Sequence, residues 1–518
     1  MQEDVKLSFT CNFTMSRNIE GLNENIKEVA EKTLEAFKKT WKDDLEKVKI
    51  EILSLNGNIL TVNFTSNLKI RPTSLALRFR KILAEDFGLK FKIGLRKVEA
   101  STIVFQIPVK EFSKEALEKI KSLTYVDEVK LEDKELHVKL KPMSESELKR
   151  NVPDRVFNLI RETLEKLEKP KQAAIEIPIV KQSPPKKVKF WEDPAKACLE
   201  YGWIKEFPGR GQWIYTTPYA KLLESIESIL LDEVVHKLDF QPFMLPKLIP
   251  LDVMRRMPGY LEEIPEGMYY VCPPPRDPEA FEEFKEAVKL TKTVPRDMLK
   301  RIIKDPEYVL APAQCEPFWQ FFSHETLRVE DLPFKLYDRS GWTYRWEGGG
   351  VEGLARLQEF RRIELVYLGT PKQVVEIRDS IVDEVVRVVD KILELEWRVV
   401  AATPFYMKEG EIGDISRSEN VAAFDVEVYL PYRGERDKAE WLEIAGCFIH
   451  KDKFVKSFSI HEAKNREIWT GCTGLGISRW ITAFLSTHGL NVEDWPLEVK
   501  RRFGEYKLPK TLLWPKKF

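Results

Sequence analysis

Between Tyr344 and Phe360 the sequence predicts two strands joined by a glycine-rich turn. The first strand ends in an Arg-x-Glu triplet formed by Arg345 and Glu347, and the return strand carries Arg356 four residues before Phe360. Glycines let such a turn reach closely over a ligand, and a guanidinium fork can grip a phosphate bidentately. A plain hairpin with flanking charges explains a single Arg-x-Glu triplet, but it explains the whole set poorly. The segment therefore requires a hairpin and favours a phosphate site on it.

A second glycine-rich segment, 471–476, predicts a strand end that opens a helix and presents Arg479. Glycine spacing of this kind is a weak indication when it stands alone. Here it follows the hairpin, and a predicted strand at 425–430 and the segment 441–444 lie between them. In this order, the hairpin and the helix resemble motifs 2 and 3 of class II aminoacyl-tRNA synthetases.

The resemblance implies an enzyme that forms an aminoacyl-adenylate and loads the amino acid onto tRNA. Glu443 matches the carboxylate that holds Mg²⁺ with ATP, a hard cation that prefers oxygen ligands. The other expected ATP-site and catalytic side chains are Arg345 for the α-phosphate, Glu347 for the adenine or amino-acid side, Arg356 for the γ-phosphate, Phe360 for stacking on adenine, and Arg479 for the phosphates.

Four further segments, 313–319, 337–341, 360–364 and 470–474, look like the methanogen type of seryl-tRNA synthetase. The resemblance covers essentially the full length. It is close from about residue 196 onward and looser before that. Seryl-tRNA formation from ATP, serine and tRNA is therefore the expected reaction, through a seryl-adenylate.

In this family one catalytic zinc ion per subunit is held by Cys, Glu and Cys, which match Cys315, Glu364 and Cys472. Three protein ligands leave the fourth tetrahedral position open, and in this family that position takes the amino group of the amino acid. Spacing alone does not identify the site, because the three residues lie far apart and isolated cysteines are often buried as small apolar residues. The zinc prediction rests on the resemblance.

The departures from the family concentrate where the amino acid is expected. Phe405 and Glu409 stand where the family has Trp and Gln, and Gly446 and Phe448 stand where it tends to have Asn and Ser. Tyr260 similarly stands for a histidine. A buried hydroxyl left without partners costs about 1–3 kcal/mol, so these exchanges are expected to weaken serine discrimination by roughly one or two powers of ten. The alternative is a paralogue that activates a different amino acid.

The N-terminal region is locally basic between residues 67 and 97. If 74–87 is a helix, Arg78 and Lys81 share one face of it. Such a face suits a phosphate backbone, because each neutralised phosphate releases counterions, but an ordinary solvated helix face explains it equally well. By resemblance, Arg78, Lys81 and Arg96 match positions that the family uses to hold tRNA.

Periodicity predicts an α+β chain in three parts. Residues 1–145 are expected to form a mixed module, tRNA-binding by resemblance, with helices at 26–41 and 74–87 and strands at 7–13, 60–64, 104–109 and 136–140. Residues 146–195 form a helical and Pro/Lys-rich linker. By resemblance, residues 196–518 are expected to form the class II catalytic domain, an antiparallel sheet flanked by helices. Motif 1 is placed at 240–248, after a helix at 219–237. It builds a homodimer interface in the family, and a buried core strand is an equally good interpretation.

The overall composition gives no independent indication of a partner, because Lys plus Arg and Asp plus Glu both total 83. No apolar stretch of about 18 residues predicts a membrane span, the N-terminus lacks a signal-peptide layout, and the scattered cysteines do not suggest secreted disulfides. We therefore expect a cytoplasmic protein. A third hypothesis, a binding protein without catalysis or one serving a carrier protein, is disfavoured by the intact motif arginines and the basic N-terminal module.

Overall fold

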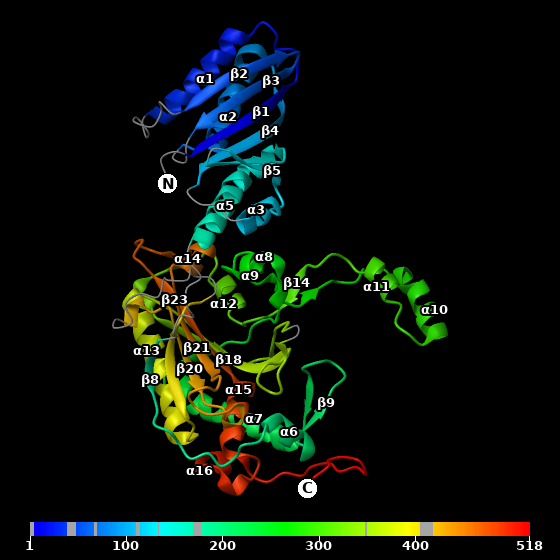
Figure 1. Cartoon of the computed structure of the whole chain (residues 1–518), viewed down its shortest axis with the longest axis vertical. Helices are drawn as coiled ribbons and strands as arrows, with labels where there is room; N and C mark the ends of the chain where they lie inside the picture. The colour runs from blue at the N-terminus through cyan, green and yellow to red at the C-terminus, as the bar shows by residue number, and fades with distance from the viewer. Residues whose placement is uncertain are drawn as a thin grey trace. The chain divides into compact units, whose positions relative to one another are not determined.

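The computed structural model describes residues 5–38, 48–66, 70–109, 114–132, 134–168, 178–347, 350–404 and 418–517. The chain forms two compact units, Met1–Ile175 and Glu176–Phe518, each with its own core (Figure 1). None of the helices in these described ranges has the length and apolar character that crossing a bilayer requires.

The first unit is built on one antiparallel sheet with strand order β2-β3-β1-β4-β6-β5, and β7 pairs with β4. Every second residue of β1 is buried, from Leu7 to Met15, so only one face of the sheet joins the core. The strands are β1 (Lys6–Met15), β2 (Lys49–Asn56), β3 (Ile59–Ser66), β4 (Leu95–Pro108), β5 (Val126–Glu132), β6 (Glu135–Leu140) and β7 (Met143–Ser144).

Helices bury apolar side chains against this core. Helix α2 (Pro72–Phe91) begins at a proline, a favoured first helical residue, and contributes Phe79 and Phe87. The predicted strands and helices of this module are confirmed, with residues 39–41 outside the described part. The other helices are α1 (Asn23–Lys38), α3 (Lys114–Lys121), α4 (Glu145–Lys149) and α5 (Val152–Glu168). Helices α4 and α5 fall in the segment 146–195 assigned above to the linker, and they add Leu148 and Phe157 to the same core.

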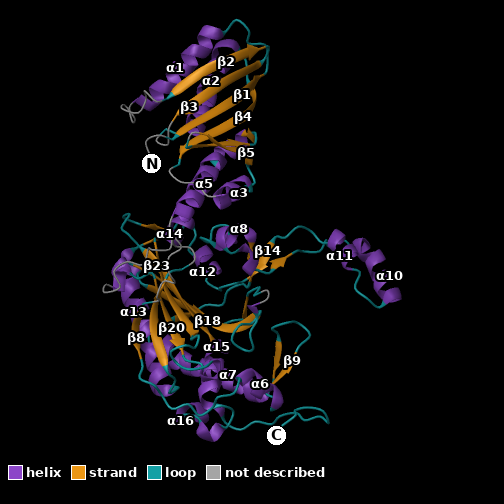
Figure 2. Ribbon diagram, in the orientation of Figure 1, coloured by secondary structure: helices purple, strands orange, loops and turns teal. Residues whose placement is uncertain are grey.

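The second unit contains a larger sheet with strand order β11-β16-β18-β23-β21-β20-β19-β8, and β17 pairs with β18 (Figure 2). All its pairs are antiparallel except β11 with β16. The predicted α+β class with an antiparallel catalytic sheet is confirmed. The strands are β8 (Ile179–Gln182), β11 (Gln241–Pro242), β16 (Phe334–Asp338), β17 (Trp342–Tyr344), β18 (Glu359–Gly369), β19 (Trp397–Ala402), β20 (Ala423–Val428), β21 (Leu442–Lys451) and β23 (Trp469–Gly476).

The two faces of this sheet serve different purposes. On β18, Ile363, Leu365 and Tyr367 point into the main core, which also receives helices α7 (Thr217–Leu230), α13 (Pro371–Arg387) and α15 (Ile477–His488). The alternate residues, from Arg362 to Leu368, point to the opposite face. That face is partly covered by α12 (Glu316–Phe321) and α14 (Lys453–Ser457), and its uncovered part carries the cavity described below.

Shorter elements complete the unit. The predicted motif 1 region follows α7 and a π-helical turn, Leu231–His236, and places β11 beside β16. The remaining helices are α6 (Pro194–Glu200), α8 (Leu251–Met254), α9 (Tyr260–Glu263), α10 (Glu282–Thr291), α11 (Arg296–Ile302) and α16 (Leu497–Phe503), and the remaining strands are β9 (Ile204–Glu206), β10 (Trp213–Tyr215), β12 (Leu248–Pro250), β13 (Tyr270–Val271), β14 (Tyr308–Leu310), β15 (Thr326–Leu327) and β22 (His461–Glu462).

Candidate functional site

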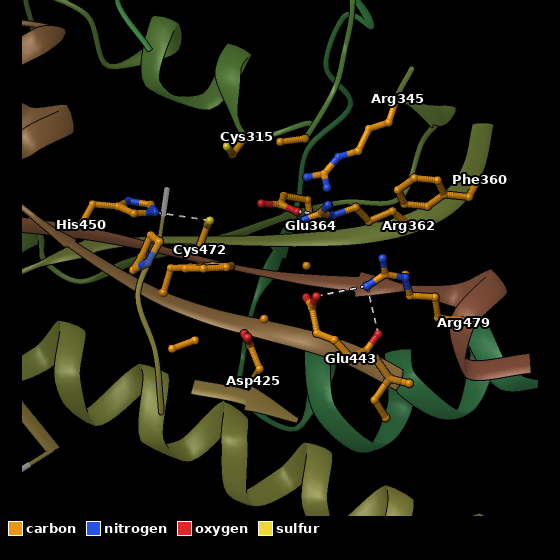
Figure 3. Close-up of a pocket in the computed structure, with 18 of the residues that line it drawn as sticks. Cys315, Arg345, Phe360, Arg362, Glu364, Asp425, Glu443, His450, Cys472 and Arg479 are labelled. Atoms are coloured by element: carbon orange, nitrogen blue, oxygen red, sulfur yellow. Dashed lines mark hydrogen bonds and ion pairs between the residues drawn. The ribbon is translucent and has the colours of Figure 1, made fainter. Parts of the chain in front are cut away.

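A cavity of about 280 Å³ lies on the open face of the large sheet. Its floor follows from the strand register, because directly paired residues of antiparallel strands point to the same face. One row across four strands reads Glu364 on β18, Gly474 on β23, Gly446 on β21 and Asp425 on β20. Two glycines thus stand at the centre of this row, with the Arg362 and Phe448 side chains packed over them, and a carboxyl group stands at each end (Figure 3).

Three potential metal ligands meet at one end of the cavity. The ligand atoms of Cys315, Glu364 and Cys472 all lie within 4.8 Å of one another, and all three residues are buried. Cys315 immediately precedes α12, and the other two stand on adjacent strands of the sheet. The three residues span more than 150 positions of the sequence; strand pairing brings Glu364 and Cys472 together, and the start of α12 adds Cys315.

The donor set fits a divalent cation. Glu364 Oε2 accepts a hydrogen bond from Arg362 Nε at 2.7 Å, while Glu364 Oε1 is buried without a hydrogen-bond partner. Two thiolates, this carboxylate and the Arg362 guanidinium carry two net negative charges between them, which a divalent ion would neutralise. Two sulfur ligands and one oxygen ligand at an open site are a donor set that zinc accepts.

Without a cation, this cluster favours its protonated forms. Burial raises the pKa of Glu364 to about 7, against the opposing effect of Arg362. The pKa of Cys472 is raised well above its ordinary value by the hydrogen bond with Cys315 and by burial. A bound cation would reverse this preference, because metal ligands bind in their deprotonated forms.

At the other end of the cavity, the predicted ATP residues converge. Arg345 lies just beyond β17, Phe360 on β18 and Arg479 on α15, and all three also border a smaller adjoining cavity that Glu347 and Arg356 line. Arg345 Nε donates a hydrogen bond to the Pro312 carbonyl at 3.1 Å, which fixes its direction. The structure therefore brings the predicted motif 2 and motif 3 side chains together.

Glu443 joins this end from β21. Its carboxylate pairs with Arg479 at 3.1 Å, and the same guanidinium donates to the Glu443 carbonyl (Figure 3). Nearby Asp425 also faces the cavity, and burial together with the charge of Glu443 raises its pKa well above the ordinary value. Asp425 Oδ1 is buried without a hydrogen-bond partner.

The predicted amino-acid pocket is partly visible. A Cβ atom placed on Gly446 would lie 2.8 Å from the ring of Phe448, so the ring occupies the space above the glycine. Phe448 is also the direct cross-strand partner of Cys472. Phe405 and Glu409 lie outside the described residues.

Sequence reasoning missed several lining residues. His450 hydrogen-bonds to Cys472, and burial lowers the pKa of His450 to about 3, so this imidazole is neutral. Asp425 and Phe454 were also not singled out. The only available indication was alternation along strands: Phe448 and His450 repeat at a spacing of two and so share a face of β21.

The predicted tRNA-binding residues belong to the first unit. Arg78 and Lys81 are exposed on α2, and Arg96 is exposed on β4. They are separate from the cavity in sequence and in structural unit.

Comparisons with known proteins agree with this division. Residues 5–162 match a tRNA-binding domain, and residues 300–488 match the class II tRNA synthetase core domain of the G, H, P, S and T type. The type-2 serine–tRNA ligase of Methanocaldococcus jannaschii is 40% identical over 480 residues, covering 91% of each chain. That of Methanopyrus kandleri is 37% identical over 536 residues, covering 99% of this chain and all of the relative.

A solved structure of M. kandleri SerRS in complex with A. aeolicus tRNASec superposes with a TM-score of 0.81 at 37% identity, over 99% of both chains. Fold, domain content and near full-length identity therefore agree. The chain belongs to the type-2 serine–tRNA ligases, a family of class II aminoacyl-tRNA synthetases.

Proposed function

We propose that the protein is a zinc-dependent serine–tRNA ligase, which forms seryl-adenylate and pyrophosphate from ATP and serine and then transfers the seryl group to tRNA, releasing AMP. The observation that carries the proposal is a single cavity with Cys315, Glu364 and Cys472 at one end and Arg345 and Arg479 at the other. An amino acid held at the first end presents its carboxylate toward the second, where the α-phosphate would lie.

Zinc, when bound, supplies an open coordination position for the amino group of the substrate. The residues around the site would orient the ligands: Arg362 holds one oxygen of Glu364, and the other, which has no hydrogen-bond partner, would bind the cation. This arrangement would favour substrates with a free α-amino group.

The arginines supply the charge that adenylate formation needs. Arg345 would contact the α-phosphate, Arg356 the γ-phosphate, and the Phe360 ring would stack on adenine. When ATP binds, the ion pair between Arg479 and Glu443 would open. The Arg479 guanidinium would then bind a phosphate, and the Glu443 carboxylate would bind Mg²⁺. Catalysis is thus by positioning and charge neutralisation.

Exposed Arg78, Lys81 and Arg96 support tRNA binding by the first unit, as does its match to a tRNA-binding domain. We further propose a homodimer formed through the motif 1 region, in the cytoplasm. Met244 is 88% exposed there, and Phe321 of α12, whose ring packs against Phe243, is 57% exposed; adjacent exposed apolar side chains can mark a partner contact. Light scattering that shows a single chain at micromolar concentration would refute the dimer.

One specific observation favours a second candidate, activation of a different amino acid. The Phe448 ring above Gly446 gives the pocket an apolar wall next to Cys472, where a serine hydroxyl would need a polar partner.

ATP–pyrophosphate exchange tests both candidates. It is measured with each of the standard amino acids and with small non-standard ones, and the zinc content is determined on the same sample. A response to serine alone would end the second candidate, and exchange without serine dependence would end the first. Arg345→Ala should lower exchange about 10²- to 10³-fold, because it removes a donor to developing charge. Unchanged activity of Arg345→Ala would contradict the mechanism itself.

A further inference from the structure

His450 lies beside the proposed metal ligands but is not one of them. Among the described residues, the ligand atoms within 4.8 Å of one another are those of Cys315, Glu364 and Cys472, and no imidazole joins this set. His450 Nε2 instead approaches the Cys472 sulfur at 3.4 Å, a distance for a hydrogen bond to sulfur (Figure 3). His450 therefore contacts the cluster through Cys472.

The other ring nitrogen is held as well. Nδ1 of His450 lies 3.2 Å from the hydroxyl oxygen of Thr470, which stands two residues before Cys472 on β23. A metal-bound thiolate carries no proton and can only accept, so Nε2 must be the protonated nitrogen. Nδ1 then accepts the hydroxyl proton of Thr470, and both hydrogen bonds point toward the sulfur.

Aromatic side chains fix the plane of this imidazole. The ring centroid of Phe454, from α14, lies 4.4 Å from the centroid of the imidazole. The ring centroid of Trp319, from α12, lies 5.6 Å from it, with the two ring planes nearly perpendicular. His450, Thr470 and Trp319 are all at most 2% exposed. Helix α12 directly follows Cys315, so the packing of His450 connects the elements that carry the two thiols.

We infer that His450 is a positioning residue, which donates a hydrogen bond from Nε2 to the Cys472 thiolate and is itself oriented by Thr470. This rests on the proposed zinc site. The hydrogen bond directs the sulfur toward the other two ligands and withdraws charge from it, which leaves the cation a better acceptor for the substrate amino group. Side chains that orient ligands in this way typically change metal affinity about 10- to 100-fold when replaced.

The test is metal binding by the full chain, stripped of metal under reducing conditions and titrated with Co²⁺. The thiolate-to-cobalt charge-transfer band reports on the sulfur, and competition with a chromophoric chelator gives the affinity. We expect His450→Phe to lower the affinity about 10- to 100-fold and to move the band to lower energy, because the sulfur lone pairs lose a hydrogen bond. His450→Gln, which keeps an N–H donor, should recover most of the affinity.

Two further variants keep the test decisive. Thr470→Val preserves side-chain volume and removes only the orienting hydroxyl, so it should weaken metal binding in the same direction even if His450→Phe does not fold. His488→Gln is the matched control: it alters a buried histidine that hydrogen-bonds to the Leu393 carbonyl and does not line the cavity, and it should leave the band unchanged.

The outcomes separate this inference from the proposed function. No metal binding by the unmodified chain would overturn the zinc site and the role of His450 together. Metal binding that neither His450→Phe nor Thr470→Val changes would overturn the role of His450 alone. Equal loss in His450→Gln and His450→Phe would mark a direct ligand or a packing role, and would also overturn it.

Discussion

Replacing Gly474 with alanine would add a methyl group between the metal end of the cavity and Arg362, the arginine that pairs with Glu364. A Cβ atom there would lie 2.5 Å from Arg362 Nε and closer still to the rest of the guanidinium. The guanidinium cannot move freely, because it is largely buried and pairs with Glu364 at 2.7 Å. Gly474→Ala therefore forces Arg362 away from Glu364.

The magnitude follows from these contacts. Overpacking a filled site costs about 1–3 kcal/mol, and the cost rises toward about 3–5 kcal/mol if the buried ion pair breaks. With its carboxylate no longer oriented, the metal site should also lose about 10- to 100-fold in affinity. Urea unfolding gives the stability change, and metal analysis after dialysis against a weak chelator gives the affinity change.

Gly476→Ala is the matched control, two residues along the same strand and on the same face. The atoms nearest to a Cβ at Gly476 are 3.9 and 4.0 Å away, ordinary van der Waals distances. We expect it to keep both the free energy of unfolding and the metal content of the unmodified protein. If Gly474→Ala and Gly476→Ala behaved alike in both measurements, the supporting role of Arg362 would be refuted.

Three other predictions test the remaining parts of the site. Phe360→Leu should raise the KM for ATP about 5- to 150-fold, since base stacking is worth about 1–3 kcal/mol, and steady-state exchange kinetics that show an unchanged KM would contradict adenine stacking. Arg78→Gln combined with Lys81→Gln should weaken tRNA binding and reduce its dependence on salt by about one unit of log–log slope per lost phosphate contact, so a filter-binding salt series with the original slope would rule these residues out. Asp425→Asn should stabilise the protein at neutral pH. In the folded protein the carboxyl of Asp425 keeps its proton above pH 3.8, its pKa in the unfolded chain, so the free energy of unfolding of the unmodified protein falls as the pH rises past that value. The fall is at most about 1.4 kcal/mol per pH unit. The gain should disappear in unfolding experiments below pH 3.8, and a gain that persists there would contradict the cause.

Local sequence rules were sufficient for much of the fold. Alternation along β1 identifies its buried face. The glycine-rich segments mark the strand ends after which Arg345 and Arg479 stand. These features depend on residues close together in the chain. The metal cluster does not, because Cys315 and Cys472 meet only through a helix start and a strand pair. Only the resemblance to a known family could propose it.

His450 and Asp425 could not be predicted for a related reason. Each becomes a site residue through its neighbours on an adjacent strand. His450 contacts the Cys472 side chain, and Asp425 is the direct cross-strand partner of Gly446. The register between strands is set by the packing of the whole sheet, so it cannot be predicted from the sequence of one strand.

Strand β21 shows how strongly this register matters for function. Gly446, Phe448 and His450 face the cavity by simple alternation, and by the same rule Glu443 would face the helical core. The pairing with β20 shifts by one residue between Ala445 and Glu443, which is a β-bulge that returns Glu443 to the cavity side beside Arg479. A single strand thus carries the contact to the ATP end and the contact to the metal end. The spacing between Glu443 and His450 therefore depends on two local irregularities, this bulge and the register shift against β23 between Ile449 and Lys451, and together they set the distance over which an amino acid and a nucleotide would meet.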